Sequence, residues 1–443
     1  MSPLIGRLVT LTTSLAAAVL VCVPATTAVA RSTGETPTTA GTIPVAAPGA
    51  EAADVAPVQV AGRCGTRLGV SQLVTDRRGV STATWGCAQR IYAARTDPDG
   101  GWRPAVSIGT GLEPRAVVDR KGRVTVLYRR LQGNGIESRR WAAGAWQRPV
   151  DLTWQTGADV VFVQWYSIAT NARGDTVAVW TQNDGEVLSG PTPRMVAAFR
   201  PFDGPWTPTV RIAPRGYADG ALVDAAGRVV VVPELYRRTA TGRWRHPVVP
   251  PMEGRFGGAA VDPAGDLLVS RMPSGGSGAV LAYEKPYGEP WHPGVQVGTT
   301  GAPIGQARTV LGASGRAAVS YPAGGSARVA VRPAGAAWAP PVQVSASGVR
   351  AGAIRLVAGP AGALVVSWTQ GDDYVERQLW VSSLPAGGDW TPPIQVTGAR
   401  WRHVDHTSTS FRPDGSVVAA WTGKVAGRPG WRFATRVVTA PAG

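Results

Sequence analysis

The segment LVTDRRGVSTATW, residues 73–85, decides the fold that we predict for this chain. It has a short apolar run, a tight turn that ends at Gly79, and a second apolar run that ends in an aromatic residue. Short apolar runs on either side of a glycine-containing turn are typical of an antiparallel hairpin. Seven later segments repeat the pattern: AVVDRKGRVTVLY (116–128), IATNARGDTVAVW (168–180), ALVDAAGRVVVVP (221–233), AAVDPAGDLLVSR (259–271), TVLGASGRAAVSY (309–321), LVAGPAGALVVSW (356–368) and TSFRPDGSVVAAW (409–421).

The spacing of these segments indicates a repeat of four strands. The turn glycines are Gly79, Gly122, Gly174, Gly227, Gly265, Gly315, Gly362 and Gly415. They lie 38 to 53 residues apart, with a mean of 48, which is the range of four-stranded blades. Each unit continues through a third apolar run and closes with a Trp, a Pro and a short Val/Ile strand, as in WAPPVQV (338–344). The pattern predicts an all-β fold, a single β-propeller of eight four-stranded blades, with seven blades as the alternative.

An aromatic residue recurs six positions after the turn glycine in six of the eight units. These residues are Trp85, Tyr128, Trp180, Tyr321, Trp368 and Trp421, and the remaining two units have Pro233 and Arg271 there. A sugar-stacking role is one interpretation. We favour core filling between neighbouring sheets, because one four-stranded sheet cannot bury its own faces and a buried aromatic removes a large apolar area from water.

The segment PVQV (57–60) matches the closing strand of a unit, yet it stands before the first unit. The last unit reaches Gly443 without a closing strand of its own. We therefore predict that residues 57–60 complete the last blade and close the propeller. Cys64 and Cys87 flank the turn at 75–79, and we predict a disulfide that bridges this hairpin.

The N-terminal region is typical of an exported protein. Residues 1–30 contain Arg7, a long apolar stretch and an Ala28-Val29-Ala30 ending, which together predict a cleaved signal peptide, with a retained membrane anchor as the alternative. The Thr-, Ala- and Pro-rich residues 31–54 predict a flexible linker, followed by the propeller at 55–443. We expect a secreted, extracellular monomer without a membrane span.

The net charge of +16 comes almost wholly from arginine, because only Lys121, Lys285 and Lys424 are lysines. One interpretation is affinity for a polyanion such as an anionic cell-wall polymer. We favour the composition of a high-GC genome, because the arginines are scattered singly, and we predict no specific nucleic-acid partner. The sequence has no P-loop, nucleophile elbow, zincin motif or EF-hand loop, so we predict no cofactor and no metal.

The repeat VDPAGDLLVS (261–270) with its closing Trp resembles the extracytoplasmic propeller repeats of actinobacterial proteins of unassigned role. It distantly resembles the sialidase-like propellers, whose Asp box, S-x-D-x-G-x-x-W, has one residue between Asp and Gly. The nearest matches here, TDRRGVSTATW (75–85) and VDPAGDLLVS (261–270), have two residues there. That family's catalytic set comprises three arginines, a Tyr/Glu pair and an acidic proton donor, and we assign none of these roles to residues of this chain.

Segments that occur in one unit only are free to be functional, whereas recurring residues belong to the scaffold. Three such links supply our candidate ligand-binding residues: Trp154, Asp159, Trp165, Tyr166, Tyr217, Asp219, Trp401, Arg402, His403 and Asp405. Shorter links add Glu113, Arg115, Glu253 and Arg255. Aromatic rings beside Asp, Arg and His suit a polar, stackable ligand such as a glycan, and loop packing is the other interpretation.

The histidines of the last link allow a second interpretation. His403, Asp405 and His406 could hold a metal ion or act in acid–base chemistry, but we favour a hydrogen-bonded surface cluster. The leading hypothesis is therefore a non-enzymatic propeller that binds a carbohydrate or another surface ligand. The alternatives are a sialidase-like glycoside hydrolase and a protein-interaction scaffold.

Overall fold

The apolar run before each turn glycine forms the first strand of its repeat unit.

The computed structural model describes residues 58–59, 64, 71–131, 134–154, 161–184, 193–246, 252, 254–274, 277–301, 305–347, 349–371 and 375–438. They all belong to one unit of the chain, Ala40–Gly443. The predicted signal peptide and linker lie outside the described residues.

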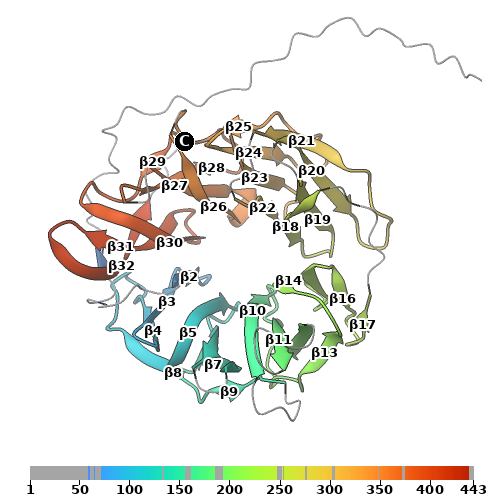
Figure 1. The fold of residues 1–443 in the computed structure, drawn as a ribbon, viewed down its shortest axis with the longest axis vertical. Helices are drawn as coiled ribbons and strands as arrows, with labels where there is room; N and C mark the ends of the chain where they lie inside the picture. The colour runs from blue at the N-terminus through green and yellow to red at the C-terminus, as the bar shows by residue number, and fades with distance from the viewer. Residues whose placement is uncertain are drawn as a thin grey trace, which may run out of the picture. The chain divides into compact units, whose positions relative to one another are not determined.

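The described residues form antiparallel sheets with four strands for each repeat unit (Figure 1). The first strands are β2 (Ser71–Thr75), β5 (Val106–Val118), β10 (Val161–Thr170), β14 (Ala218–Val223), β18 (Arg255–Val261), β22 (Arg308–Leu311), β26 (Ala351–Ala358) and β30 (Trp401–Phe411). The second strands are β3 (Ser81–Cys87), β6 (Val124–Arg130), β11 (Thr176–Asp184), β15 (Val229–Pro233), β19 (Leu267–Met272), β23 (Ala317–Ala323), β27 (Leu364–Gln370) and β31 (Val417–Val425).

The third and fourth strands are given in the order of the eight units, and only β1, which completes the last unit, lies out of chain order. The third strands are β4 (Arg90–Arg95), β7 (Ile136–Ala142), β12 (Arg194–Arg200), β16 (Tyr236–Arg238), β20 (Gly278–Lys285), β24 (Ser326–Arg332), β28 (Gln378–Leu384) and β32 (Arg428–Val438). The fourth strands are the first part of β5, the short β8 (Ala145–Trp146) and β9 (Val150–Asp151), β13 (Val210–Ala213), β17 (Trp244–Arg245), β21 (Val295–Thr300), β25 (Val342–Gln343), β29 (Ile394–Gln395) and β1 (Val58–Gln59).

Strand β5 makes the number of sheets differ from the number of repeats. Its first part pairs with β4 and its second part pairs with β6, so the first two units share one eight-stranded sheet. The other six units form separate four-stranded sheets, which makes seven sheets among the described residues. The expected all-β architecture is confirmed. The short 3-10 turn Pro360–Gly362 is a helical exception, and no helix in the described part of the chain is long and apolar enough to cross a membrane.

The turn glycines hold the first hairpin of each unit. All eight have positive φ, between 73° and 104°, a region that a residue without Cβ occupies at little cost. An acidic side chain often completes the turn: Asp76 Oδ1 accepts from the backbone N–H groups of Arg78 and Val80, at 2.9 and 3.0 Å. Such local bonds explain why Asp precedes so many of these glycines.

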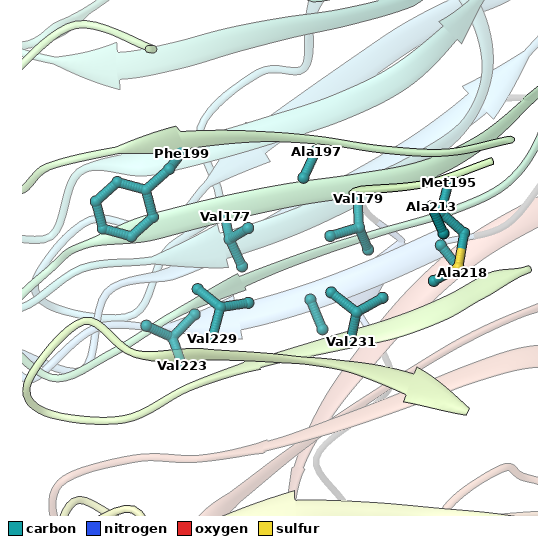
Figure 2. Close-up of a cluster of buried hydrophobic side chains, with 11 residues drawn as sticks. Val177, Val179, Met195, Ala197, Phe199, Ala213, Ala218, Val223, Val229 and Val231 are labelled. Atoms are coloured by element: carbon teal, nitrogen blue, oxygen red, sulfur yellow. The ribbon is translucent and has the colours of Figure 1, made fainter. Parts of the chain in front are cut away.

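The recurring aromatics fill the spaces between neighbouring sheets, as we predicted. Trp180, Tyr321, Trp368 and Trp421 are fully buried. Each packs against side chains of the preceding unit; Trp180, for example, lies with Leu127 and Ile136. Where Pro233 replaces the aromatic, aliphatic side chains from the two facing sheets make the contact instead, with Met195 and Phe199 at its ends (Figure 2).

The N-terminal strand β1 belongs to the last sheet, whose order is β1-β32-β31-β30. Val58 pairs with Thr435 and Gln59 with Ala434. The prediction that the early PVQV segment supplies the missing fourth strand is confirmed for this pairing. The first and last units also contact each other directly, because Trp85 stacks on Phe433 with ring centroids 5.3 Å apart.

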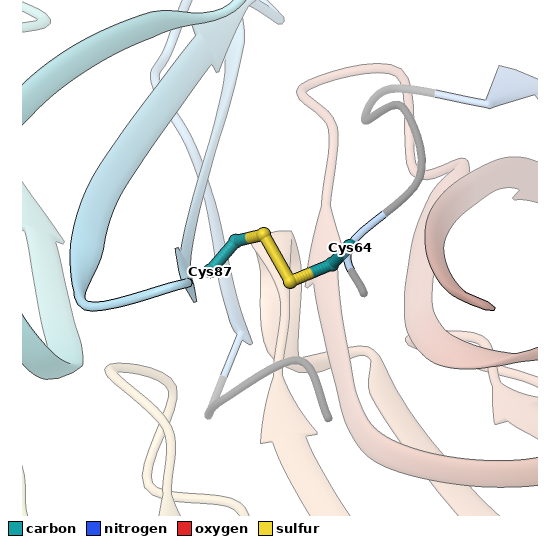
Figure 3. Close-up of a disulfide and its surroundings, with 2 residues drawn as sticks. All are labelled: Cys64 and Cys87. Atoms are coloured by element: carbon teal, nitrogen blue, oxygen red, sulfur yellow. A yellow bond between two sulfur atoms is a disulfide. The ribbon is translucent and has the colours of Figure 1, made fainter. Parts of the chain in front are cut away.

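The predicted disulfide is present, but it does not bridge the first hairpin. Cys64 and Cys87 are bonded, with their Cα atoms 5.9 Å apart (Figure 3). Cys64 pairs with Trp431 of β32 through two backbone hydrogen bonds of 3.2 Å, whereas Cys87 ends β3. The bridge therefore ties a segment held by the last sheet to the first sheet, and the hairpin interpretation was wrong.

Deletion of residues 55–61 removes β1 and tests the contribution of this pairing. We expect the melting temperature to fall by roughly 5 °C, because the last sheet loses its fourth strand and each kcal/mol lost shifts the midpoint of a large domain by about 2 °C. The measurement is thermal unfolding followed by circular dichroism. Deletion of seven residues within 31–54 is the matched control, and an unchanged midpoint in the first variant would contradict a stabilising role for β1.

Candidate functional site

Side chains from the first strands of seven units line one cavity of about 600 Å³. We call it the inner-strand cavity and define it by Gln72, Arg115, Asp219, Phe256, Arg308 and Arg355. Its volume lies within the roughly 300–1,000 Å³ that is usual for small-molecule sites. The lining residues come from β2, β5, β14, β18, β22 and β26, with Trp165 and Tyr166 added from β10.

β-Bulges aim the lining side chains into this cavity. The register of β5 shifts between Leu112 and Arg115, and that of β26 shifts between Gly352 and Arg355. The extra residues include Glu113 and Ala353, whose φ values are 54° and 46°. A bulge bends its strand and re-aims the side chains that follow, which here places an arginine at the cavity wall.

The residue seven positions before the turn glycine lines this cavity in six of the eight units. The eight residues are Gln72, Arg115, Ser167, Gly220, Gly258, Arg308, Arg355 and Ser408, of which Gly220 and Ser408 are not part of the lining. In two units the side chain joins neighbouring units: Ser408 Oγ accepts from Leu73 N at 3.2 Å, and Gln72 Oε1 accepts from Ala116 N at 2.6 Å. Three units carry arginine instead, which makes the lining cationic.

The three arginines form a cluster of like charges. Burial, followed by the nearby charges of Arg308 and Arg115, lowers the pKa of Arg355 to about 10. Burial and the charge of Arg115 also lower the pKa of Arg308. None of the three guanidinium groups makes a hydrogen bond or an ion pair with another described residue. The Nε atoms of Arg115 and Arg308 are buried without a hydrogen-bond partner among those residues.

An exposed pair of aromatic rings lies at the cavity, where Trp165 is part of the lining. Trp165 and Tyr217 are 50% and 44% exposed, and their ring centroids lie 4.9 Å apart at an interplanar angle of 89°. Trp165 lines the cavity together with Asp219. Tyr166 is buried, and its hydroxyl donates to the backbone oxygens of Leu112 and Glu113, so it fastens β10 to β5.

Asp219 places a carboxylate in the same cavity. Partial burial raises its pKa, and no hydrogen bond or ion pair with another described residue offsets that effect. Burial also raises the pKa of Glu234, and the neighbouring charge of Asp219 adds to this. Glu234 in turn accepts from the backbone N–H of Tyr217 at 3.3 Å. The cavity thus holds unpaired groups of both signs.

Two predicted aromatic residues lie in packed positions. Trp154 packs against the core beside Trp180, and the guanidinium of Arg194 lies 5.6 Å from its ring centroid. Trp401 is only 7% exposed and meets Trp421 edge-on, with centroids 5.2 Å apart. Little of the Trp401 ring is available to a ligand. Asp159 lies outside the described residues.

The predicted link at 397–408 contains the beginning of strand β30, because pairing starts at Trp401. His403 and His406 have φ values of 52° and 44°, and the strand register shifts beside each of them. Asp405 Oδ1 accepts from the backbone N–H of His406 at 2.8 Å, and Arg402 donates to the backbone oxygen of Ala399 at 2.6 Å. The described residues contain no group of three or more His, Cys, Asp and Glu side chains that could hold a metal ion.

The structure therefore gathers Trp165, Tyr166 and Asp219 at one cavity, with Tyr217 against Trp165. Sequence reasoning missed Arg308, Arg355 and Phe256, and it named Arg115 only as a link residue. The signal that could have found the arginines is their common offset of seven from the turn glycine. The candidate residues were selected from the links between units, whereas Arg308 and Arg355 lie within strands.

No protein-family model matches the sequence, and no curated protein matches it. Solved structures similar to this chain include a protein of unknown function from Dyadobacter fermentans, with 8% identity and a TM-score of 0.40, covering 86% of this chain and 97% of that one. An ulvan lyase of polysaccharide lyase family PL25, bound to -[GlcA(1-4)Rha3S]-, has 13% identity and a TM-score of 0.47, covering 86% and 98%. AofleA from Arthrobotrys oligospora has 11% identity and a TM-score of 0.38, covering 76% and 88%. Similarity at these levels carries no function over to this chain.

Replacement of Asp219 by Asn tests the environment of its carboxyl. A raised folded-state pKa means that stability is greatest below the unfolded-state pKa, about 3.9, and is lost as the pH rises through the folded-state value. We expect the melting temperature of Asp219→Asn, relative to the parent chain, to increase between pH 3 and pH 7. Thermal unfolding across that range measures it.

Asp203 offers a control of opposite sign. Its hydrogen bond with Arg123 lowers its pKa, so its contribution to stability is present above the unfolded-state pKa and is lost as the pH falls. Asp203→Asn should therefore lose melting temperature, relative to the parent chain, as the pH rises. A difference for Asp219→Asn that stays flat or falls with pH would show that the cavity does not desolvate this carboxyl.

Proposed function

We propose that this chain is a secreted, non-enzymatic β-propeller that binds an acidic carbohydrate in the inner-strand cavity. The observation that carries the proposal is the cluster of Arg115, Arg308 and Arg355, three guanidinium groups that line one cavity without a hydrogen bond or ion pair to another described residue. Their mutual repulsion and partial burial favour binding of an anion, which would remove both penalties. A guanidinium matches the planar, two-oxygen edge of a carboxylate or sulfate better than an ammonium does.

The exposed rings of Trp165 and Tyr217 support the carbohydrate part of the proposal. Trp165 and Tyr217 keep about half of their surface exposed although they contact each other. Exposed rings of this kind offer an apolar face and a polar tip to a sugar ring. A ligand with an anionic group at the arginines and a sugar ring against Trp165 would contact both kinds of lining side chain.

The same proposal includes a closed ring of eight blades. Supporting observations are the eight repeats, the pairing of β1 with β32 and the packing of Trp85 on Phe433. We count the shared eight-stranded sheet as two blades, because β5 pairs with β4 over its first part and with β6 over its second. The disulfide supports export, since such bonds persist in oxidising compartments.

The test compares acidic oligosaccharides with neutral counterparts that differ only in the charge. We expect oligogalacturonates to bind in calorimetry and their methyl esters not to bind. Arg308→Gln combined with Arg355→Gln should weaken binding about a hundredfold, because each lost charge-assisted contact contributes roughly 1.5–3 kcal/mol. Trp165→Ala should weaken binding about tenfold through lost stacking.

The matched control is Arg90→Gln combined with Arg148→Gln, which removes the same net charge from two exposed positions. If this control weakens binding as much as the cavity variant, general attraction to a basic protein accounts for the binding. Equal affinity for the acid and its ester would also contradict the proposal. A panel that includes sulfated oligosaccharides distinguishes a carboxylate ligand from a sulfate ligand.

Asp219 favours a second candidate function, a glycoside hydrolase of sialidase-like type. Its carboxyl shares the cavity with the three arginines, and burial raises its pKa, as a proton donor at near-neutral pH requires. On this hypothesis, Asp219→Asn should retain affinity for an acidic glycoside but lose turnover by about a thousandfold. Chromogenic glycosides of acidic sugars measure the turnover, and no release of chromophore by the parent chain would contradict it.

A further inference from the structure

The contact between the fourth and fifth units is the place where the recurring aromatic is missing. In that register the fifth unit has Arg271, whose guanidinium donates to the backbone oxygen of Gly254 at 3.4 Å. The buried apolar cluster between β14–β17 and β18–β21 consists of Val230, Val232, Leu235, Leu267 and Val269. It is the smallest such cluster among the described residues, and the register position that holds an aromatic residue in six units holds an arginine here.

A groove of about 570 Å³ opens between these two sheets. Its apolar part includes Val230, Leu235 and Trp291. The groove extends to the turn residues Asp224 and Gly265, whereas the inner-strand cavity is lined by neither. Strands β16 and β17 have only three and two residues, so the outer part of the fourth sheet leaves the apolar surface partly uncovered.

The charged lining of the groove is almost entirely cationic. Its charged side chains are Arg228, Arg237, Arg238, Arg245 and Lys285, with the single carboxylate of Asp224. That carboxylate already forms an ion pair with Arg228. His246 lines the groove as well and meets Tyr236 edge-on, with ring centroids 4.8 Å apart.

Two of these cations form no ion pair within the described residues. The Arg237 guanidinium makes no hydrogen bond there, and Lys285 Nζ donates to the backbone oxygen of Glu289, at 2.7 Å. Burial and the charge of Arg228 lower the pKa of Arg237, and burial and the charge of Arg237 lower that of Lys285. The two side chains therefore share a cationic region at the edge of an apolar surface.

We propose that this groove is a second ligand site, for a small molecule that combines one anionic group with an apolar body, such as an aliphatic carboxylate. Arg237 and Lys285 bind the anionic group, and Val230, Leu235 and Trp291 contact the apolar body. The volume suits a ligand of this size. This site is independent of the carbohydrate proposed for the inner-strand cavity, because the two share no lining residue.

The fluorescent probe 8-anilinonaphthalene-1-sulfonate, an anion with an apolar body, tests the proposal on the full chain. We expect saturable binding at one site, displaced by decanoate but not by decanol. Arg237→Gln combined with Lys285→Gln should weaken binding about tenfold or more. Circular dichroism checks that the variant is folded, and a second variant, Arg245→Gln, should weaken binding by a smaller factor.

A matched variant makes the outcome decisive. Arg90→Gln with Arg148→Gln removes the same charge from exposed positions, and it should bind the probe like the parent chain. Unchanged affinity in the groove variant, an equal loss in the control, or displacement by decanol as effective as that by decanoate would overturn the proposal.

Discussion

The constraint on which the structure depends is that a four-stranded sheet cannot bury its own faces. Each sheet must meet a neighbour on both sides, and one position per unit repeatedly supplies the side chain that fills the contact. Burial of such an aromatic contributes roughly 3–5 kcal/mol as an upper bound, from about 150–250 Å² at about 25 cal/mol per Å². The first and last sheets have the same need, which the packing of Trp85 on Phe433 meets. Strand β1 also pairs with β32 of the last sheet. The disulfide joins Cys64, which pairs with the same strand, to Cys87 of the first sheet.

This constraint also explains where the molecule departs from its own repeat. Where Pro233 replaces the aromatic, Met195 and Phe199 from the neighbouring strand β12 keep the contact filled. Where Arg271 replaces it, Phe256 and Trp291 pack against the cluster but stay only partly buried, and a groove lies between the two sheets. The two exceptions are adjacent units, yet they differ in outcome, because only the first has Met195 and Phe199 buried on the facing third strand.

Much of the fold could be predicted from the sequence, because its determinants recur. Glycines at one register, aromatics six residues later and an early copy of the closing strand each follow from local backbone geometry or from alternation along a strand. The sharing of β5 by two units could not be predicted, since hydrogen-bonding partners leave no mark on composition. The lining of the candidate cavity was predicted only in part. Trp165 and Asp219 were singled out because they occur once and they do line it, whereas Trp401 also occurs once and is nevertheless buried against Trp421.

The arginines show why the absence of repetition is an incomplete guide to function. The position of Arg115, Arg308 and Arg355, seven residues before the turn glycine, exists in every unit. These three units differ from the others in the charge of the side chain there. Gln72 and Ser408 show that a polar side chain in that position can join neighbouring units by hydrogen bonds. Within the described residues, the arginine side chains in the same position make no such bond and add like-charge repulsion in a partly desolvated cavity, which opposes folding. Three residues that are unfavourable for stability at one cavity therefore point to a ligand that neutralises them.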